Sequence, residues 1–272
     1  RELLLDRLKL LAEARRAESS SGCSDSRLRR RGKPQLVFNA VDDDHCETPS
    51  IAYDAILPLL EIIASILGKK KHEILIYDPY FCDGAVVQNL SQRGFPNVYN
   101  RNEDFYVAVE KKTFPAYDVL VTNPPYSGDH VERLLTFCIG SKKPFFCLMP
   151  NHVYSSAYYD SLTKDCRPFY LVPKKCRYSY VTPVGFRGNA KNKKTSPFIT
   201  FWYCHGSEHT GNMIKLLRKG IEGACDSSGI SLVGNLRGLP QRARATFDPK
   251  RKRLRKKQRI SQNIKRSNSP CK

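Results

Sequence analysis

Residues 119–126 have the sequence Val-Leu-Val-Thr-Asn-Pro-Pro-Tyr, an apolar run that stops abruptly at two prolines. Neither proline has an N–H to donate to a sheet ladder, and both favour an extended residue before them. The apolar run at 117–121 is therefore predicted to be a strand that ends here. Asn123 and Tyr126 then stand at its carboxyl end, where open α/β sheets bind ligands.

A second strand–loop–helix unit precedes this one in the chain. Residues 74–77, Ile-Leu-Ile-Tyr, are apolar throughout, as expected of a central parallel strand. Asp78 and Pro79 follow it, and Gly84 would let the backbone approach a ligand before a predicted helix at 85–93. The pattern predicts a ligand cradle. One glycine is a weaker signal than a full Gly-x-Gly-x-x-Gly, and an ordinary turn fits Asp-Pro equally well.

Strand-like runs alternate with helical patterns along the middle of the chain. Further strands are predicted at residues 36–38, 97–100, 145–150, 169–173 and 198–204. This alternation is typical of an α/β fold with a mostly parallel, doubly wound sheet. The first helix of this region is expected to have Thr48 as its N-cap and Pro49 in its first turn. Pro58 should kink or split that helix, and Gly68 should end it.

The charge of the chain is strongly positive and unevenly distributed. Among 272 residues, 46 Lys/Arg and 26 Asp/Glu give 46 − 26 = +20. Residues 237–272 hold 14 Lys/Arg against one acid, so +13 of that charge lies in the last 36 residues. The partner implied is polyanionic, with nucleic acid favoured over an acidic membrane surface. No run of 18 apolar residues exists, so no membrane span is predicted.

Composition divides the chain into three parts. Residues 1–35 are predicted to form an amphipathic helix and a basic Ser/Arg/Gly-rich linker, 36–220 the folded domain, and 221–272 a basic, mostly disordered tail. The N-terminal helix is interpreted as a solvated helix at the domain edge, and a docking helix for a protein partner is the alternative. The tail indicates a nuclear or nucleolar address, a nucleic-acid arm, or both. Otherwise a cytoplasmic protein is expected.

The cysteines and acidic clusters predict no metal site. No two of the ten cysteines form a Cys-x-x-Cys pair, and most lie among apolar residues, as small core side chains do in a reducing compartment. The run Asp-Asp-Asp-His at 42–45 is interpreted as a solvated loop, because metal ligands come from alternate rather than contiguous positions.

A segment after residue 176 combines aromatic and basic side chains. The residues of interest are Arg177, Tyr178, Tyr180, Arg187, Lys191, Lys193 and Lys194. Aromatic rings beside cations can stack on bases while the cations hold phosphates, so a nucleic-acid contact is predicted. The alternative is an edge hairpin whose aromatic rings belong to the core.

Asn-Pro-Pro-Tyr after one strand and Asp-Pro with Gly84 after an earlier strand together resemble a known family. They are similar to the S-adenosylmethionine-dependent amino-methyltransferases, specifically the adenine-N6 enzymes with an Asp/Asn-Pro-Pro-Tyr/Phe motif. The resemblance extends over about residues 44–204 and implies the Rossmann-like fold of class I methyltransferases.

The resemblance also implies S-adenosyl-L-methionine as cofactor. The residues that it assigns to cofactor binding are Thr48, Pro49, Asp78, Pro79, Gly84, Asp104 and Phe105. Asp78 and Gly84 would border the methionine part, and the acid–aromatic pair would meet the adenine. Only 33 residues separate Gly84 from Asp118, so one strand or helix of the family's sheet is expected to be abbreviated. Glu103 therefore stays open as an alternative to Asp104.

The resemblance gives the Asn-Pro-Pro-Tyr residues catalytic roles. An exocyclic amine is a poor nucleophile because its lone pair is delocalised into the ring. Holding its N–H groups on the Asn123 side-chain oxygen and the Pro124 carbonyl would point the lone pair at the sulfonium methyl. Pro124 and Pro125 would keep that carbonyl rigid, and Tyr126 would stack on a flipped or unpaired base.

Adenine-N6 methylation of RNA is the function expected first, because of the basic tail and the lysine-rich loop. DNA adenine methylation is the alternative substrate. Protein glutamine methylation also uses Asn-Pro-Pro-Tyr, but the Asp-Pro cradle and the basic tail argue against it. The non-enzyme alternative is an inactive methyltransferase fold that binds RNA, and the intact Asn-Pro-Pro-Tyr argues against that.

Overall fold

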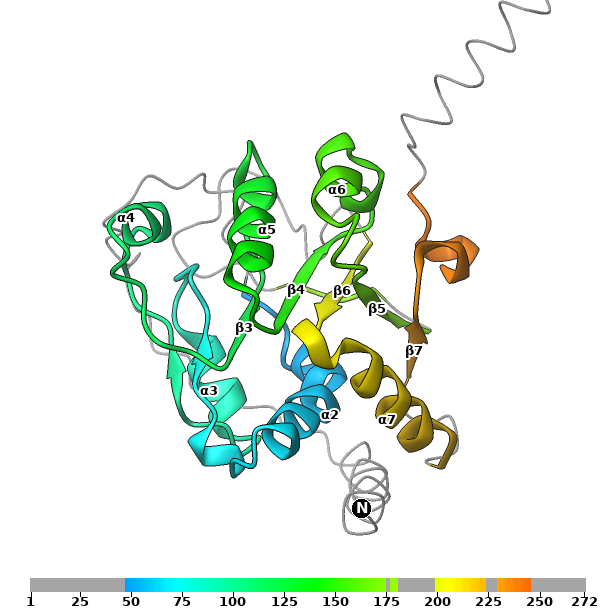
Figure 1. Ribbon diagram of the computed structural model, residues 1–272, viewed down its shortest axis with the longest axis horizontal. Coiled ribbons are helices and arrows are strands. Elements are labelled where there is room, and N and C mark those ends of the chain that lie inside the picture. Colours follow the sequence, from blue (N-terminus) through cyan, green and yellow to red (C-terminus); the bar gives the residue numbers. More distant parts are fainter. Residues whose placement is uncertain (1–46, 175–176, 181–198, 224–228, 246–272) are drawn as a thin grey trace, which may run out of the picture.

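The computed structural model describes residues 47–174, 177–180, 199–223 and 229–245, and a seven-stranded mixed sheet lies at its centre (Figure 1). The strands are β1 (Ile76–Tyr77), β2 (Val98–Tyr99), β3 (Val119–Thr122), β4 (Phe145–Pro150), β5 (Phe169–Pro173), β6 (Thr200–His205) and β7 (Ile230–Val233). Their spatial order is β2-β1-β3-β4-β6-β5-β7. The strand predicted at 36–38 lies outside the described residues.

Half of this sheet is parallel and half is antiparallel. β2, β1, β3 and β4 pair in parallel, whereas β4 with β6, β6 with β5, and β5 with β7 pair antiparallel. The α/β class predicted from the sequence is present, but the expected mostly parallel sheet occurs only in the first half. An apolar run predicts a buried strand without its direction, because direction depends on the neighbour with which it pairs.

The first strands create a reversal in the sheet order. From β1 the chain moves to β2 on one side, and it then returns to place β3 on the other side of β1. In open α/β sheets, ligands bind outside the carboxyl ends of strands at such a reversal. The topology therefore points to the ends of β1 and β3, where Asp78 and Asn123 follow the strands.

Helices cover both faces of the sheet (Figure 1). One face holds α2 (Ser50–Ile66), α3 (Ala85–Ser91) and α7 (Thr210–Gly223), and the other holds α4 (Phe105–Glu110), α5 (His130–Ser141) and α6 (Ala157–Leu162). Short 3-10 turns complete the chain at η2 (Lys71–Glu73), η3 (Val153–Ser155), η4 (Ser207–His209), η5 (Leu236–Gly238) and η6 (Gln241–Ala243). Alternate residues of each central strand face the two cores, as Val119 and Leu120 do in β3.

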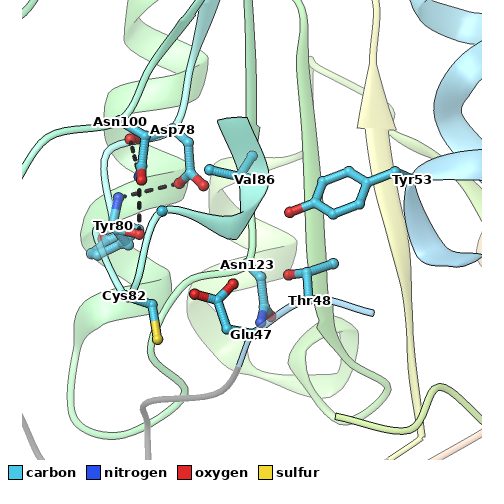
Figure 2. A pocket seen from close by; sticks show the side chains of 10 residues that line it. Glu47, Thr48, Tyr53, Asp78, Tyr80, Cys82, Val86, Asn100 and Asn123 are labelled. Atoms are coloured by element: carbon cyan, nitrogen blue, oxygen red, sulfur yellow. Dashed lines mark hydrogen bonds between the residues drawn. The ribbon is translucent and has the colours of Figure 1, made fainter. Parts of the chain in front are cut away.

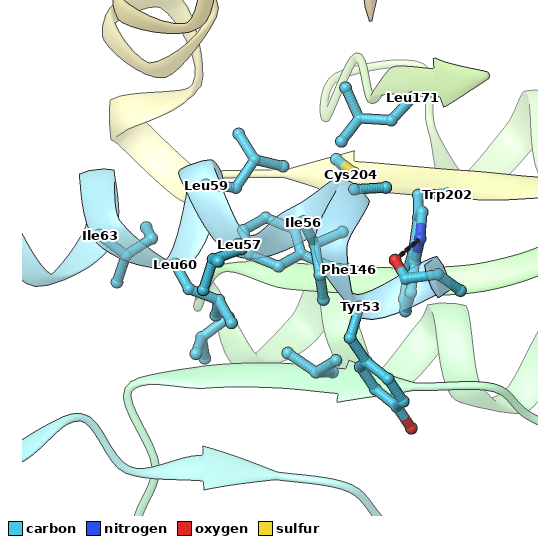
Figure 3. Packing of buried hydrophobic residues seen from close by; sticks show 14 of the residues in the cluster. Tyr53, Ile56, Leu57, Leu59, Leu60, Ile63, Phe146, Leu171, Trp202 and Cys204 are labelled. Atoms are coloured by element: carbon cyan, nitrogen blue, oxygen red, sulfur yellow. Dashed lines mark hydrogen bonds between the residues drawn. The ribbon is translucent and has the colours of Figure 1, made fainter. Parts of the chain in front are cut away.

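α2 is the most deeply buried helix and organises one core (Figure 3). Its apolar side chains pack on β4, β5 and β6, and the Trp202 indole donates a hydrogen bond of 2.9 Å to the Ala52 carbonyl. α2 continues through Pro58 as one helix, so the split that was one of the two outcomes expected from the sequence does not occur. A proline inside a helix costs about 3 kcal/mol. Burial of aliphatic side chains on both sides of it, at about 1.5–3 kcal/mol each, exceeds that cost.

The start of α2 also differs from the prediction. The N-cap residue is Pro49 and the helix begins at Ser50, so Thr48, the predicted cap, lies one position before the observed cap. Gly68, at φ +64°, follows the C-cap and ends the helix as predicted. The shift at the start leaves the Thr48 side chain available for a different role, described below.

Residues 229–245, here called the C-terminal strap, belong to the fold. β7 pairs with β5 as an edge strand, and Leu239 and Ala243 are buried. The Arg242 guanidinium donates to the Pro173 carbonyl at 3.2 Å. The predicted boundary at 220/221 is thus corrected, since part of the supposed tail completes the sheet. The prediction relied on the low apolar density of this segment. Pairing with β5 supplies a hydrogen-bond ladder that does not depend on apolar side chains. Among the described residues, no helix is long and apolar enough to span a bilayer.

Candidate functional site

A pocket lies at the carboxyl ends of β1 and β3, where the strand order reverses (Figure 2). Its cavity volume is about 30 Å³, which is room for about two water molecules. The residues that line it are Glu47, Thr48, Tyr53, Asp78, Tyr80, Cys82, Gly84, Val86, Asn100 and Asn123. Within the part of the chain that the structure describes, no Lys, Arg or His side chain lines it. The pocket is thus rich in oxygen atoms and bears two carboxyl groups.

Asp78 lies at the tip of β1 and is buried. Its Oδ1 accepts hydrogen bonds from Thr122 Oγ1 at 2.6 Å and from the Tyr80 N–H at 3.2 Å. Burial raises the pKa of Asp78 to about 7; these two hydrogen bonds oppose the increase, and the nearby Glu47 adds to it. Because Thr122 ends β3, the short bond from its hydroxyl fixes the two strand tips to each other.

The loop after Asp78 leads into α3 through a left-handed residue. Gly84 has φ +78° at the N-cap of α3, a conformation that glycine adopts without the strain of a Cβ atom. Glu47 supports this loop, because its Oε1 accepts a hydrogen bond of 2.8 Å from the Asp83 N–H. Burial raises the pKa of Glu47, and backbone hydrogen bonds from Asp83 and Ala85 partly oppose that rise. The predicted role of Gly84 in the loop matches its conformation.

Six lining residues were not predicted as site residues from the sequence, namely Glu47, Tyr53, Tyr80, Cys82, Val86 and Asn100. Asn100 follows β2, and its Nδ2 donates to the carbonyls of Asp78 at 3.1 Å and Tyr80 at 3.4 Å. Its Oδ1 is buried with no hydrogen-bond partner among the described residues. A buried acceptor without a partner costs about 1–3 kcal/mol, so this atom suits a donor on a ligand. In the sequence, the position of Asn100 at the end of a predicted strand could have marked it as a site residue.

Asn123 also lines the pocket, and Tyr126 orients its amide. The Tyr126 hydroxyl donates to Asn123 Oδ1 and lies 3.3 Å from the Leu148 carbonyl oxygen. The Tyr126 ring packs against the core on the α5 side. The structure therefore brings Asn123 and Asp78, from separate motifs, to one pocket. It also gives the Tyr126 hydroxyl a positioning contact that the stacking role predicted from the resemblance did not include.

The remaining residues that the resemblance assigned to the site lie beside the pocket or away from it. Thr48 is buried in the pocket wall, whereas Pro49 serves as the N-cap of α2. Pro79 is buried directly after Asp78. Within the Asn-Pro-Pro-Tyr motif, Pro124 is buried and Pro125 is half-buried. None of the four prolines is in the lining, so their contribution is to backbone shape.

The predicted acid–aromatic pair has structural roles. Asp104 is the N-cap of α4, and its Oδ1 accepts from the N–H groups of Tyr106 at 2.8 Å and Val107 at 3.2 Å. Phe105 is buried in the core beneath α5. The alternative acid, Glu103, accepts a hydrogen bond from the Tyr99 hydroxyl at 3.0 Å. None of these acids lines the pocket, and Asn100 is the polar residue that the β2 end places there.

The aromatic residues predicted to stack on bases are core residues. Tyr178 and Tyr180 are 4% and 6% exposed, and the Tyr180 hydroxyl donates to Thr200 Oγ1 at 2.6 Å. Their rings are thus unavailable to a base in this structure, which corrects the stacking prediction in favour of its core alternative. Arg177 is exposed. The other predicted contacts, Arg187, Lys191, Lys193 and Lys194, lie outside the described residues.

A hydrogen-bonded cluster at α4 and α5 joins the two loops of the site. The Tyr80 hydroxyl lies 3.1 Å from the Tyr106 hydroxyl, which in turn bonds His130 Nδ1. The Arg133 guanidinium lies 3.5 Å from the centre of the Tyr106 ring. Tyr80 belongs to the loop after β1, and His130 begins α5 after the Asn-Pro-Pro-Tyr loop. The cluster therefore holds both loops against one helix pair.

The described residues contain no group of three or more His, Cys, Asp or Glu side chains arranged to hold a metal ion. Comparison with models of known protein families gave no match, and neither did searches of curated proteins and of solved structures. Functional inference for this chain therefore depends on the pocket and its residues.

Proposed function

We propose that this protein is an S-adenosylmethionine-dependent methyltransferase that acts on an exocyclic amine, with adenine N6 in RNA as the favoured substrate. The observation that supports it most is the meeting of Asp78 and Asn123 in one pocket. They come from the two motifs that resemble the adenine-N6 enzymes, and each directly follows a strand beside the reversal in the sheet. Neighbouring parallel strands bring their carboxyl ends together, so the sheet accounts for the meeting of the two residues, and the resemblance of both motifs supports the role assigned to them.

The order of the first strands is compatible with this proposal. β2-β1-β3-β4 are parallel, with the reversal between β1 and β3, as in doubly wound nucleotide-binding sheets. Among the described residues β2 is the edge strand of the parallel half, and α4 is the only α-helix between β2 and β3. This arrangement suits a Rossmann-like methyltransferase sheet with one strand abbreviated.

The residues of the pocket suit the proposed cofactor chemically. S-adenosylmethionine supplies an activated methyl group on a sulfonium, and it also bears an ammonium and ribose hydroxyl donors. The pocket presents the carboxyl groups of Asp78 and Glu47 and the unpartnered Asn100 Oδ1. A cavity of about 30 Å³ is far smaller than the sites that enclose whole ligands, so we assign only the charged part of the cofactor to it.

Asn123 is the residue we assign to the substrate amine. An amide oxygen has two lone pairs, so the hydrogen bond from Tyr126 is compatible with a second one from an amine N–H. The Tyr126 contact fixes the direction of the amide before substrate arrives, which reduces the orientational cost of the reaction. The strongly basic composition, with a net charge of +20, supports a nucleic-acid substrate.

The test is incubation of the full chain with tritiated S-adenosylmethionine and separate RNA, DNA and protein fractions from cells that lack the gene. We expect label in RNA, as N6-methyladenine after digestion. Asn123→Ala should reduce transfer by about a thousandfold, since orientation and dipole stabilisation are lost, while cofactor affinity changes by less than about twofold. Asn97→Ala, outside the pocket lining, is the matched control and should keep full activity.

Label found in DNA or in protein instead of RNA would make that fraction the substrate class. Full activity of Asn123→Ala would disprove the proposed role of the amide. Absence of both cofactor binding, by calorimetry, and transfer to every fraction would refute the methyltransferase proposal.

A further inference from the structure

We infer that the exposed arginines of the C-terminal strap, Arg237, Arg242 and Arg244, form a phosphate-binding surface that holds RNA beside its target base at Asn123. This inference rests on the proposed function and names the surface that would hold its substrate. The strap, residues 229–245, contains these three arginines and no acid. All three are exposed, and none forms an ion pair with an acid in the part of the chain that the structure describes. Their charges are therefore available to a polyanion.

The strap lies along the same edge of the sheet as the candidate site. β4 and β5 both pair antiparallel with β6, so they run in one direction and their carboxyl ends share an edge with those of β1 and β3. The Arg242 guanidinium donates to the Pro173 carbonyl at the end of β5, and the Asn151 amide, just after β4, donates to the Ala243 carbonyl. The strap therefore crosses this edge from β5 towards β4, and β4 is the neighbour of the strand that leads to Asn123.

Charge divides this edge into two parts on either side of Asn123. On the β1 side, the pocket holds the carboxyl groups of Glu47 and Asp78, and no described Lys, Arg or His lines it. On the β4 side, the strap and residues 151–159, which follow β4, contain no acid. A phosphate backbone is favoured on the β4 side, because opposite charges attract it there and the carboxylates repel it from the other side. Asn123 stands between the two parts, where methyl donor and target base must meet.

Hydrogen bonds fix two of the guanidinium groups in place. Arg244 donates to the carbonyls of Leu239 at 3.0 Å and Arg237 at 3.3 Å, and Arg242 donates to that of Pro173 at 3.2 Å. A guanidinium has five N–H donors, so each of these groups keeps at least three for a ligand. A cation that is already oriented loses little conformational entropy when it binds a phosphate.

The competing explanation is that the arginines only brace the strap. It does not apply to Arg237, because the hydrogen bonds of this residue among the described residues use its backbone N–H and carbonyl and not its guanidinium. Arg237 therefore separates a phosphate-binding role from a bracing role.

Fluorescence anisotropy of the full chain with labelled oligoadenylate at several salt concentrations tests the surface. The oligomer has about 20 nucleotides, which is longer than a single binding module usually covers. Each phosphate contact with a single strand contributes about 0.7 to the slope of log affinity against log salt concentration. Combined Arg237→Gln, Arg242→Gln and Arg244→Gln should therefore lower the slope by about 2 and the affinity at least about tenfold. Arg237→Gln alone should lower the slope by about 0.7 and leave unfolding in urea unchanged.

A matched lysine variant separates local contact from loss of net charge. Combined Lys70→Gln, Lys111→Gln and Lys142→Gln remove three exposed charges from the segments that precede β1, β3 and β4, at the opposite edge of the sheet. Net charge falls by three in both triple variants, yet the lysine variant should change the slope by less than about 0.5.

Methyl transfer gives a second readout, which depends on the length of the RNA. Asn123 and Pro173, which binds Arg242, follow strands three places apart in the sheet, a separation of roughly 14 Å. The arginine variant should raise KM for the long oligoadenylate at least about fivefold, with kcat within about twofold of wild type. On an adenylate dinucleotide it should match wild type, because the single phosphate beside Asn123 does not reach the strap.

An unchanged slope in the arginine variants, or an equal change in the lysine variant, would overturn the inference and leave the proposed function standing. An unchanged slope together with lost binding to phosphatidylserine vesicles would overturn it in favour of a membrane surface. Absence of RNA binding by wild type, with methyl transfer to DNA or protein, would refute both the inference and RNA as the substrate. Normal RNA binding without transfer to any fraction would refute the proposed function, and the salt slopes would still decide the role of the arginines.

Discussion

Asp78 is positioned by groups that lie far from it in the sequence. Thr122, at the end of β3, donates a hydrogen bond of 2.6 Å to its Oδ1, and Asn100, after β2, donates to its carbonyl at 3.1 Å. Three neighbouring strands thus converge on one residue. Burial makes the ionised carboxylate unfavourable, and the Thr122 hydroxyl partly restores it. The same surroundings that hold Asp78 therefore also determine its protonation near neutral pH.

At this scale we predict that Asp78 lowers the free energy of unfolding of the ligand-free protein by an amount that depends on pH. Its folded pKa of about 7 lies above the ordinary value of 3.8, so the folded state retains the proton longer than the unfolded state. The stabilising contribution is complete below about pH 4 and is lost as the pH rises through 7. Asp78→Asn should therefore gain stability over wild type by on the order of 2 kcal/mol between pH 5 and pH 8.

Urea unfolding at several pH values measures this difference. Thr122→Val is the companion variant. It removes a hydrogen bond that favours the ionised form, so it should raise the pKa of Asp78 further and extend the loss of stability to higher pH. Parallel pH profiles for wild type and Asp78→Asn would contradict the prediction.

The loop between β1 and α3 shows how an element positions a site. The loop must turn from the tip of β1 into α3 within a few residues, and Gly84 makes the turn in a left-handed conformation. A Cβ atom at Gly84 would meet nothing nearer than the Phe81 ring, at 3.8 Å. Glycine is therefore required here by the positive φ of the backbone and not by lack of space for a side chain.

At the scale of elements we predict that Gly84→Ala destabilises the protein by about 1 kcal/mol, because an L-residue is strained at positive φ. It should also weaken cofactor binding, since the loop borders the pocket. Gly140→Ala in α5 is the matched control: it has no positive φ and open space around it, and should stabilise by about 0.5–1 kcal/mol. Thermal unfolding and calorimetry measure both. A gain in stability in Gly84→Ala would show that the loop tolerates a side chain.

The C-terminal strap links the far edge of the sheet to the loop after β4. β7 pairs with β5, the Asn151 amide donates to the Ala243 carbonyl at 3.3 Å, and the Ala245 N–H donates to the Tyr154 hydroxyl at 2.8 Å. Residues 246–272 follow the strap with 11 Lys/Arg and one acid. The strap thus ends near the residues that follow β4, the neighbour of the strand that leads to Asn123.

For the whole molecule we predict that two truncations have different effects. Removal of 229–272 should reduce the free energy of unfolding by more than about 2 kcal/mol, because it exposes the edge of β5 and buried side chains of the strap. Removal of 246–272 alone should change stability by less than about 1 kcal/mol. It should instead weaken RNA binding and flatten its dependence on salt, since phosphate contacts release counterions.

Urea unfolding and fluorescence anisotropy with labelled RNA at several salt concentrations distinguish the two truncations. Equal stability of both would mean that the strap contributes little to the fold. An unchanged salt slope after removal of 246–272 would restrict that segment to a role other than RNA binding.

By itself, the sequence determined the features that depend on neighbouring residues. β3 ends at Thr122, shortly before the two prolines, glycine turns the loop at residue 84, and the apolar runs mark the buried strands, because backbone sterics and side-chain periodicity act locally. Asp78 and Asn123 could be expected in one site since both follow parallel strands.

Only the tertiary structure decided features that depend on distant partners. It gave the second half of the sheet its antiparallel pairing, buried Tyr178, used Asp104 as a cap and brought Glu47 and Asn100 into the pocket. Hydrogen-bond partners such as Asn151 and Ala243 lie 92 positions apart. Burial and pairing energies are set by such contacts, and no local pattern in the chain encodes which distant residue will supply them.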